Sequence, residues 1–325
     1  MNSDKILPIH SNFTSASQLV FGCMGLGGGW NNNAISKTDV SQASEIVNLA
    51  LELGINVFDH ADIYTFGKAE QVFGQVLKNA PGLREHMFIQ SKCGIRFADN
   101  TGPKRYDFSA SWISHSVEKS LQQLNVDYLD MLLLHRPDPL MDIAETAVAL
   151  NQLAASGKVK SLGVSNMHHG QIKLLQSELK LPIVANQIEM SLAQLDWLED
   201  GITTGSRAAR DNDFATGLLE YCQLHNIQMQ AWGSMAQGKV TSHQKNESER
   251  QAALVNLVEE LASIYQTSAE AIALGWLMRL PMAIQPVIGT TNPDRIKACA
   301  KAQNLILSRE HWYQLYETAR GAEMP

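Results

Sequence analysis

Short runs of apolar residues alternate along the chain with longer stretches in which apolar residues recur every three or four positions. The clearest run is Tyr128–His135, whose Met131–Leu134 core is continuously apolar, as expected of a strand that is covered on both faces. This rhythm predicts parallel strands joined by crossover helices. The predicted strands are Gln18–Cys23, Asn56–Asp59, Met87–Lys92, Tyr128–His135, Lys160–Val164, Ile183–Gln187, Ile227–Ala231 and Ile284–Val287.

Amphipathic stretches between these runs predict the helices. Ser109 and Asp142 suit N-cap positions, because their side-chain oxygens can accept hydrogen bonds from free first-turn amides. Gly54 and Gly157 suit helix ends, where a positive φ is easily adopted by glycine. The predicted helices are Asp39–Leu53, Ala69–Asn79, Ala110–Leu124, Ile143–Ser156, Gln171–Ser177, Gly217–His225, Glu249–Ala262, Ala269–Arg279 and Pro293–Lys301.

Eight strands that alternate with helices either close into a barrel or form an open doubly wound sheet. An open sheet that binds a dinucleotide carries Gly-x-Gly-x-x-Gly between its first strand and a helix. Here Trp30 stands where the third glycine of such a motif belongs, and a polar stretch precedes the next helix. Long polar connections, Asp196–Asp213 and Gly233–Ser248, follow strands six and seven, at the ends where barrel enzymes keep their sites. We therefore expect an α/β fold, a (β/α)8 TIM barrel with long loops after strands six and seven, as a single domain over residues 1–325.

Composition narrows the class of protein further. The chain has 325 residues, of which 45% are hydrophobic and 18% charged, and its formal net charge is −7. A nucleic-acid-binding protein would need a basic face, so we expect no nucleic-acid partner. The four cysteines show no metal-ligand spacing, which indicates reduced thiols. Because neither a signal core nor an apolar run of membrane-spanning length is found, we expect a cytoplasmic protein without a membrane partner.

Polar side chains gather at the C-terminal ends of the predicted strands. Asp59 ends the second strand and Tyr64 follows it, Lys92 ends the third strand, and His135 ends the fourth. The ammonium of Lys92 would lower the pKa of Tyr64, Asp59 would keep Lys92 charged, and His135 can donate to a carbonyl oxygen. Such a set would protonate an oxygen while a hydride arrives at carbon. Taken singly, these residues also fit structural roles, as a buried ion pair, a packed aromatic and a core histidine.

A metal-dependent hydrolase is an alternative interpretation, because His60, Asp62 and His135 are plausible ligand types at strand ends. In such a site the lysine and the tyrosine would have no role. The pair His168-His169 resembles a ligand pair, but it begins a predicted helix, where solvent exposure explains it. We expect no metal site.

At the strand ends the sequence resembles the aldo-keto reductase family, in a bacterial oxidoreductase branch. The resemblance extends from about residue 19 to about residue 302, and its motifs fall in order on successive strands. These motifs are Asn56–Tyr64 (Asn-Val-Phe-Asp-His-Ala-Asp-Ile-Tyr), Gln90–Lys92, Leu132–Asp138, Gly157–Asn166 and Asn186–Glu189. The resemblance implies reduction of a small-molecule carbonyl substrate, with Tyr64 as general acid and Asp59, Lys92 and His135 completing a catalytic tetrad.

The resemblance also implies a dinucleotide cofactor held by several loops. Barrels often bind phosphate after strands seven and eight, where a helix N-terminus supplies amides. Threonine hydroxyls and the forked guanidinium of Arg295 suit a 2′-phosphate, so we expect NADP(H) rather than NAD(H). The residues that the resemblance assigns to the cofactor are Cys23, Met24, Ser165, Asn166, Gln187, Trp232, Gly233, Ser234, Met235, Gln237, Gly238, Lys239, Gly289, Thr290, Thr291 and Arg295.

A second function remains open. Some aldo-keto barrels serve as channel-associated subunits that sense redox state through a bound cofactor with little turnover. Trp30 and Trp197 lie in loops expected at the barrel mouth and are candidates for walls of the substrate pocket, although a loop tryptophan equally often covers a barrel rim. The physiological substrate and the oligomeric state do not follow from these residues.

Overall fold

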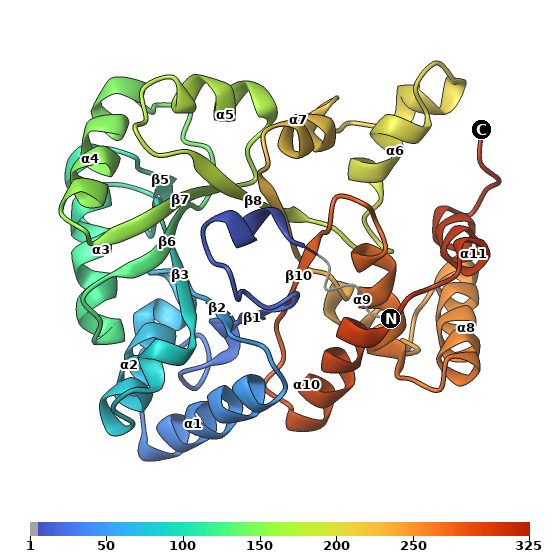
Figure 1. Ribbon diagram of the computed structural model, residues 1–325, viewed down its shortest axis with the longest axis horizontal. Coiled ribbons are helices and arrows are strands. Elements are labelled where there is room, and N and C mark those ends of the chain that lie inside the picture. The colour runs from blue at the N-terminus through green and yellow to red at the C-terminus, as the bar shows by residue number, and fades with distance from the viewer. Residues whose placement is uncertain (1–5) are drawn as a thin grey trace.

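The computed structural model describes residues 6–325, and its eight parallel strands close into a barrel surrounded by helices (Figure 1). Around the barrel the strands follow the order β1-β10-β9-β8-β7-β6-β3-β2. Each lies on an apolar run that predicts it, so the predicted (β/α)8 fold is confirmed. The strands are β1 (Val20–Gly22), β2 (Val57–Asp59), β3 (Phe88–Cys93), β6 (Leu129–Leu134), β7 (Val159–Ser165), β8 (Ile183–Glu189), β9 (Gln228–Trp232) and β10 (Gln285–Ile288).

Helices cover the outside of the barrel, and each predicted helix is present. They are α1 (Lys37–Glu52), α2 (Lys68–Asn79), α3 (Ala110–Leu124), α4 (Ile143–Ala155), α5 (His169–Gln176), α7 (Leu218–Leu224), α8 (Glu249–Ile264), α9 (Ala269–Met278) and α10 (Pro293–Ala300). Ser109 and Asp142 accept first-turn amides as the N-caps of α3 and α4. Gly54 and Gly157 follow α1 and α4 with φ of 74° and 77°. The helix boundaries therefore follow the local signals in the sequence.

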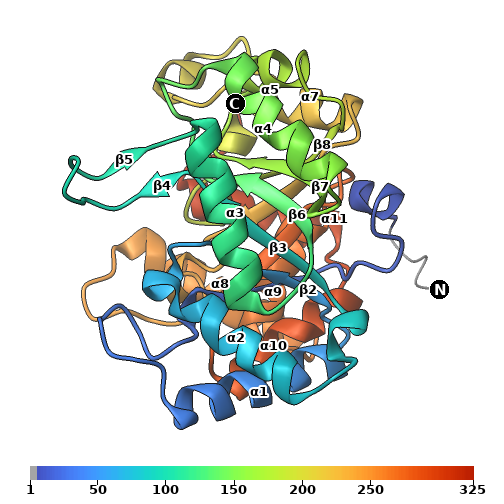
Figure 2. The same ribbon diagram turned by 90° about the vertical axis from the view of Figure 1, so that its left-hand side faces the viewer.

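Further elements were not predicted. Strands β4 (Ile95–Arg96) and β5 (Arg105–Tyr106) form an antiparallel arm after β3 that projects from the body of the molecule (Figure 2). Helix α6 (Asp196–Ile202) lies inside the connection predicted as a loop after strand six. Helix α11 (Arg309–Arg320) lies beside α8 at the edge of the molecule (Figure 1). The two-residue strands β4 and β5 are too short to show an alternation. Helix α11 does show a helical period, since its buried residues Trp312, Leu315, Tyr316 and Ala319 lie at i, i+3, i+4 and i+7, so its signal was present in the sequence and was missed.

Helix α11 is anchored by a pair of tryptophans. The ring of Trp312 stacks on that of Trp276 in α9, with centroids 5.3 Å apart and planes 10° from parallel. Each indole N–H donates to the other residue's backbone carbonyl, at 3.1 and 3.0 Å. Since both rings are buried and both N–H groups are satisfied, this contact fixes the C-terminal helix to the barrel's outer layer.

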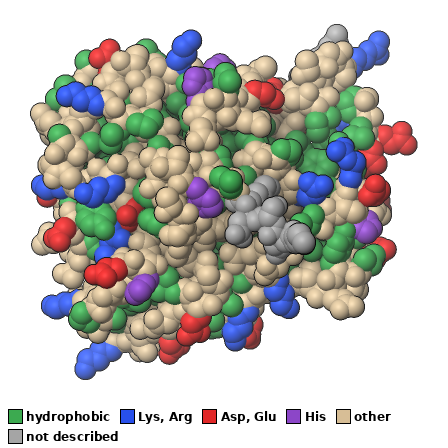
Figure 3. Space-filling model, in the orientation of Figure 1, with side chains coloured by type: hydrophobic (Ala, Val, Ile, Leu, Met, Phe, Trp, Pro, Cys, Tyr) green, Lys and Arg blue, Asp and Glu red, His purple; other side chains and the backbone are tan. Residues whose placement is uncertain are grey.

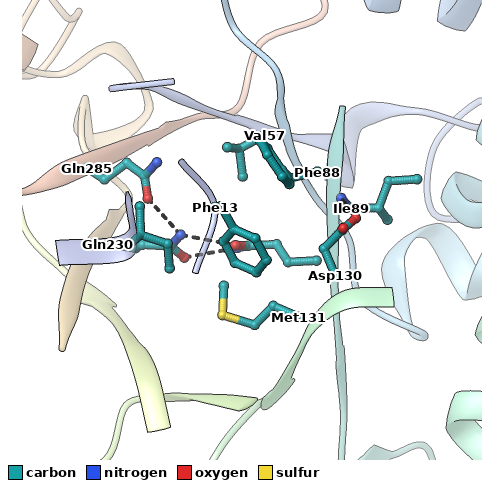
Figure 4. Close-up of a pocket in the computed structure, with 10 residues that line it drawn as sticks. Phe13, Val57, Phe88, Ile89, Asp130, Met131, Gln230 and Gln285 are labelled. Atoms are coloured by element: carbon teal, nitrogen blue, oxygen red, sulfur yellow. Dashed lines mark hydrogen bonds between the residues drawn. The ribbon is translucent and has the colours of Figure 1, made fainter. Parts of the chain in front are cut away.

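The N-terminal segment closes one end of the barrel. The short helix η1 (Pro8–Ser11) lies across that end in Figure 1. Ile9 and Phe13 are buried in one cluster with inward side chains at the strand starts, such as Val20 and Val57. Above them is a cavity of about 10 Å³, room for about one water, lined by Phe13 and Met131 and by the glutamines shown in Figure 4. The functional residues must therefore use the opposite end, where the strands finish.

The surface carries charges of both signs. On the face shown in Figure 3, Lys and Arg side chains are interspersed with Asp and Glu side chains around the rim. Across residues 6–325, we find no helix with the combined length and apolar character that crossing a membrane requires.

Candidate active site

The four residues of the predicted tetrad come together at the C-terminal end of the barrel. Asp59 ends β2, Lys92 lies near the end of the neighbouring β3, and His135 follows β6 on the far side of β3. The Lys92 Nζ donates to Asp59 Oδ2 at 2.7 Å and to the Tyr64 hydroxyl oxygen at 2.9 Å. Its third hydrogen bond goes to the backbone carbonyl of His60 at 3.0 Å. The ammonium therefore uses all three of its donors in a fixed geometry.

Tyr64 is held by an unusual backbone turn. It opens the short helix η3 (Tyr64–Gly67), in which Thr65 and Phe66 adopt left-handed φ of 48° and 61°. This region costs a residue with a side chain about 1 kcal/mol or more, so the surroundings must hold it. The Thr65 hydroxyl is 2.9 Å from the backbone carbonyl of Leu26, in the loop after β1. Backbone strain is thus concentrated directly beside the phenol.

His135 faces the phenol from the other side. Its ring centroid lies 6.0 Å from that of Tyr64, with the planes at 79°. Burial lowers the pKa of His135 well below its usual range, and the charges of Lys92, Arg136 and Lys104 act in the same direction. The imidazole is therefore neutral at neutral pH and able to donate one N–H.

The protonation state of Tyr64 corrects one expectation. The ammonium of Lys92 does favour the phenolate, but burial of the phenol outweighs it and the pKa of Tyr64 is raised above 10.0. Burial lowers the pKa of Lys92, but Asp59 and Tyr64 oppose it and the pKa ends above 10.5. The site therefore holds a protonated phenol beside a charged ammonium across the neutral range.

The residues of the alternative metal site do not form a ligand group in the described part of the chain. His60 is buried, lies edge-on to Phe73 at 4.5 Å, and burial lowers its pKa to about 3. Asp62 is buried as well, and burial with the nearby Glu70 raises its pKa to about 7. His168 caps α5 by accepting backbone amides. Within the described part of the chain, no three His, Cys, Asp or Glu side chains form a group that could hold a metal ion.

The residues predicted to hold the nicotinamide lie at the ends of β7, β8 and β9. The Asn166 Nδ2 donates to Ser165 Oγ at 2.8 Å, and Asn166 Oδ1 accepts from the Trp232 indole at 3.1 Å. Ser165 Oγ donates in turn to the backbone carbonyl of Gln187 at 2.8 Å. The Gln187 side chain points into the barrel, where its Nε2 is 3.1 Å from Asp59 Oδ1. One connected network therefore joins this predicted contact region to the tetrad.

The loop after β9 meets the segment after β10. The Ser234 hydroxyl donates to the Val287 carbonyl at 2.9 Å, and a Cβ on Gly238 would lie 3.6 Å from the Arg295 guanidinium. Met235 Sδ lies 3.8 Å from the Cys299 thiol of α10. Gln237 is exposed, with a left-handed φ of 58°. The two predicted phosphate-binding segments, residues 233–239 and 289–295, thus lie against each other.

The first turn of α10 does not offer the free backbone amides that were expected to bind a phosphate. Asn292 Oδ1 accepts the amides of Asp294 and Arg295 at 2.9 and 3.2 Å, and Pro293 has no amide proton. These first-turn amides are already satisfied, so an anion here depends on side chains. Those side chains are Thr290, Thr291 and Arg295, beside the exposed backbone of Gly289. The Arg295 Nε is 3.9 Å from a Glu270 oxygen.

Of the two cofactor contacts predicted in the loop after β1, only Met24 has an accessible side chain. Met24 is 51% exposed, whereas the Cys23 side chain is buried and its thiol donates to the Phe21 carbonyl at 3.7 Å. A Cβ on Gly25 would lie 3.0 Å from Thr291 Cγ2. This loop therefore runs beside the segment after β10, with the Met24 side chain accessible.

Comparison with known proteins identifies the family. The model of the aldo/keto reductase family matches residues 18–320. The chain belongs to the aldo/keto reductase family. A 6-dehydroglucose reductase of Agrobacterium fabrum is 37% identical over 312 residues, which cover 95% of this chain and 96% of the relative. The oxidoreductase YdhF of Escherichia coli is 35% identical over 298 residues, 91% of each chain. The resemblance to bacterial oxidoreductases of this family is confirmed.

A solved structure supports the same fold. An aldo-keto reductase from Klebsiella pneumoniae, in complex with NADPH, superposes with a TM-score of 0.71. It is 22% identical in sequence and the match covers 95% of this chain and 92% of that one. The closed barrel is thus the fold of this aldo/keto reductase.

The mouth of this aldo/keto reductase carries an aromatic wall. Trp30 is 47% exposed and meets the ring of Phe66 edge-on at 5.3 Å; Phe66 in turn lies 5.3 Å from Phe97. Phe66 and Phe97 were not predicted, although both closely follow tetrad residues in the sequence. Trp197 does not fit its prediction: it is 1% exposed in α6 and packs edge-on against Trp276. The unpredicted helix turns its side chain into the core.

Proposed function

We propose that this aldo/keto reductase transfers a hydride between NADP(H) and the carbonyl group of an aldehyde or ketone, with Tyr64 as the general acid. The observation that carries the proposal is the chain of contacts from Asp59 through Lys92 to Tyr64, at 2.7 and 2.9 Å. A phenol in contact with a fixed ammonium is a proton donor whose anion is stabilised as it forms. The four described tetrad residues include no serine or cysteine nucleophile that a base could activate for hydrolysis.

Each member of the tetrad has a distinct task in this proposal. Tyr64 gives its proton to the carbonyl oxygen, and Lys92 stabilises the resulting phenolate. Asp59 keeps Lys92 charged despite its burial. His135, neutral because burial lowers its pKa, donates a hydrogen bond that orients the carbonyl oxygen. Because the pKa of Tyr64 is raised, its proton is retained until negative charge develops on the substrate oxygen.

The residues at the mouth fit a phosphorylated dinucleotide. When bound, NADPH supplies the hydride. Arg295 offers a charged fork and Thr290 and Thr291 offer hydroxyls beside the open backbone of Gly289. This donor set suits a 2′-phosphate, which distinguishes NADP(H) from NAD(H). The NADPH complex of the Klebsiella pneumoniae relative supports this choice of cofactor.

The residues on the substrate side of the mouth are compatible with several classes of carbonyl compound. The exposed rings of Trp30 and Phe66 suit an apolar carbonyl compound or the C–H face of a sugar. The Agrobacterium fabrum relative is named a 6-dehydroglucose reductase, which makes a hexose with an aldehyde at carbon 6 a first compound to test. Aromatic aldehydes and simple ketones complete the panel.

The proposal is tested with Tyr64→Phe, which removes only the phenolic hydroxyl. We expect kcat for NADPH-dependent reduction to fall by about 10²–10⁴-fold, the usual contribution of a general acid. NADPH affinity, followed by tryptophan fluorescence, should be unchanged. Tyr128→Phe is the matched control, because Tyr128 precedes β6 at the opposite end of the barrel and should keep full activity. Near-native turnover by Tyr64→Phe refutes the role, and tight NADPH binding by the wild type without turnover of any compound favours the sensor function.

A further inference from the structure

A closed ring of hydrogen bonds lies directly beneath the tetrad. Asp59 Oδ1 accepts from Gln90 Nε2 at 2.6 Å and from Gln187 Nε2 at 3.1 Å. Both of these nitrogens also donate to Gln230 Oε1, at 2.9 and 3.1 Å. The four side chains come from β2, β3, β8 and β9, so the ring reaches across the inside of the barrel. We refer to Asp59, Gln90, Gln187 and Gln230 as the glutamine ring.

Strand register explains why these side chains meet. Asp59 is the register partner of Gln90 across β2 and β3, and Gln230 is the partner of both Gln187 and Gln285 across β8, β9 and β10. Register partners in a parallel sheet point to the same side, which here is the barrel interior. Asp59 and these four glutamines form one polar layer next to the apolar cluster of Ile9 and Phe13, and Figure 4 shows Gln230 and Gln285 facing each other there.

At the centre of this layer, the Gln230 amide makes every hydrogen bond that it can. Gln90 and Gln230 form a reciprocal amide pair, because Gln230 Nε2 donates back to Gln90 Oε1 at 3.0 Å. The second Gln230 hydrogen goes to Gln285 Oε1 at 2.9 Å, and Gln285 Nε2 donates to the Ser17 carbonyl at 2.6 Å. Gln230 thus donates twice and accepts twice, the full capacity of a primary amide.

The direction of donation around the ring is fixed by Asp59, which only accepts hydrogen bonds. An ionised carboxylate only accepts hydrogen bonds, so Gln90 and Gln187 must turn their NH₂ groups toward it, and Gln230 must then turn its oxygen toward them. With Oδ1 held by two amides, Oδ2 is left facing Lys92. Asp59 is only 2% exposed, and these three donors supply the hydrogen bonds that water would otherwise give.

We propose that Gln90 and Gln230 are positioning residues for the carbonyl reduction: they fix the orientation of Asp59 and, through it, the place of Lys92 and of the Tyr64 hydroxyl. This inference rests on the proposed function of the tetrad. According to this inference, the polar layer affects the rate of carbonyl reduction as well as filling the barrel interior. A lost amide donor lets the carboxylate rotate, and a misplacement of about 1 Å costs about 10²-fold in rate.

The first experiment compares Gln90→Met with a matched control, Gln228→Met. Gln228 is also buried inside the barrel, but it donates to the Ala283 and Met229 carbonyls at 2.7 and 2.9 Å and accepts from the Ile9 amide at 3.4 Å, and these hydrogen bonds lie outside the glutamine ring. Both variants should lose stability to urea. We expect kcat to fall by about 10–10²-fold in Gln90→Met only, with KM for the carbonyl compound and NADPH affinity unchanged. Equal loss of kcat in both variants would overturn the inference, as would wild-type kcat in Gln90→Met.

A double-mutant cycle then asks whether the effect passes through Asp59. If Gln90 acts only by holding that carboxylate, Gln90→Met should lower kcat no further in an Asp59→Asn background. Full additivity contradicts the inference. If Gln90→Met does not fold, Gln230→Met breaks the ring one residue away from Asp59 and is read in the same way. Wild-type kcat in Asp59→Asn itself would refute the proposed tetrad, an outcome distinct from a failure of the glutamine ring alone.

Discussion

The buried pair of Lys92 and Asp59 leads to a quantitative prediction for Asp59→Asn. The side chains are only 1% and 3% exposed, and their charged atoms are 2.7 Å apart. At an effective dielectric constant of about 20, their attraction is about 6 kcal/mol, which the desolvation of two ions, several kcal/mol each, largely cancels. The pair as a whole therefore adds little. Removing only the carboxylate leaves the ammonium buried without a counter-charge, and we expect a loss of about 3–5 kcal/mol in the free energy of unfolding at neutral pH.

The same substitution predicts a change in pH dependence. In the wild type, burial lowers the pKa of Lys92, but Asp59 and Tyr64 outweigh it and raise the pKa above 10.5. The interaction of the charged ammonium with these two groups is therefore fully present below pH 10.5 and is lost as pH rises through the folded-state value. In Asp59→Asn, burial acts on Lys92 without the opposing carboxylate and favours loss of its proton. The difference in stability between variant and wild type should therefore shrink as pH rises from neutral toward about 10.

Urea unfolding followed by tryptophan fluorescence, at neutral pH and near pH 10, measures both effects. Glu118→Gln is the control, because Glu118 pairs with Lys158 on the surface, where the two side chains are 54% and 39% exposed. Such a pair contributes at most about 1 kcal/mol. If Asp59→Asn costs no more than Glu118→Gln, or if its cost does not change with pH, the reasoning about the uncompensated ammonium is wrong.

Gly94 has a φ of 104°, and a Cβ there would lie 2.0 Å from the Phe108 ring, so Gly94→Ala should destabilise the protein by about 3 kcal/mol or more. Gly54→Ala, with open space around the Cβ, should cost only about 1 kcal/mol in the same thermal unfolding assay, and equal losses would contradict the steric argument. Burial raises the pKa of Glu70 from 4.5 to about 7, and burial together with Glu70 raises that of Asp62 to about 7 as well, so wild-type stability should fall as pH rises through that range. In urea unfolding, Glu70→Gln should remove about 3 kcal/mol of this decline and leave the share of Asp62, and an unchanged decline would exclude Glu70 as a source. The Arg136 guanidinium lies at the mouth, 5.4 Å over the Trp232 ring, so Arg136→Met should raise KM about tenfold for aldehydes that carry a carboxylate, while an equal rise for uncharged aldehydes would count against charge recognition.

Much of the fold could be predicted because the barrel strands are covered on both faces. A strand such as β6 contains the continuous apolar run Met131–Leu134, which stands out against the amphipathic helices around it. The tetrad was predictable for a related reason: polar side chains at the ends of adjacent parallel strands must meet at one rim. Contacts within the site, by contrast, depend on side-chain directions. The raised pKa of Tyr64 results from burial, which spacing along the chain does not reveal.

Other features gave weaker signals. Trp197 was expected at the mouth because its segment looked like a polar loop, yet a short helix turns the ring inward. The glutamine ring did leave a trace in the sequence, since Gln90, Gln187 and Gln230 are polar residues inside buried strands. Their contact depends on how the barrel closes, which brings Gln90 within hydrogen-bond distance of Gln230, 140 positions later in the chain. Only the closed strand order makes them neighbours.

The order of strands places the two proposed functional groups of residues in different halves of the chain of this aldo/keto reductase. The proposed proton-donating groups come from residues 59–135, whereas the proposed phosphate-binding segments come from residues 233–295. Substitutions in residues 233–295 can thus change the coenzyme preference while residues 59–135 keep the proposed general acid. The glutamine ring is the exception, since β2 and β3 supply one side of it and β8 and β9 the other. If the halves of a recombinant from two relatives do not match at this layer, we expect the proposed proton donor to lose its alignment although every tetrad residue is retained.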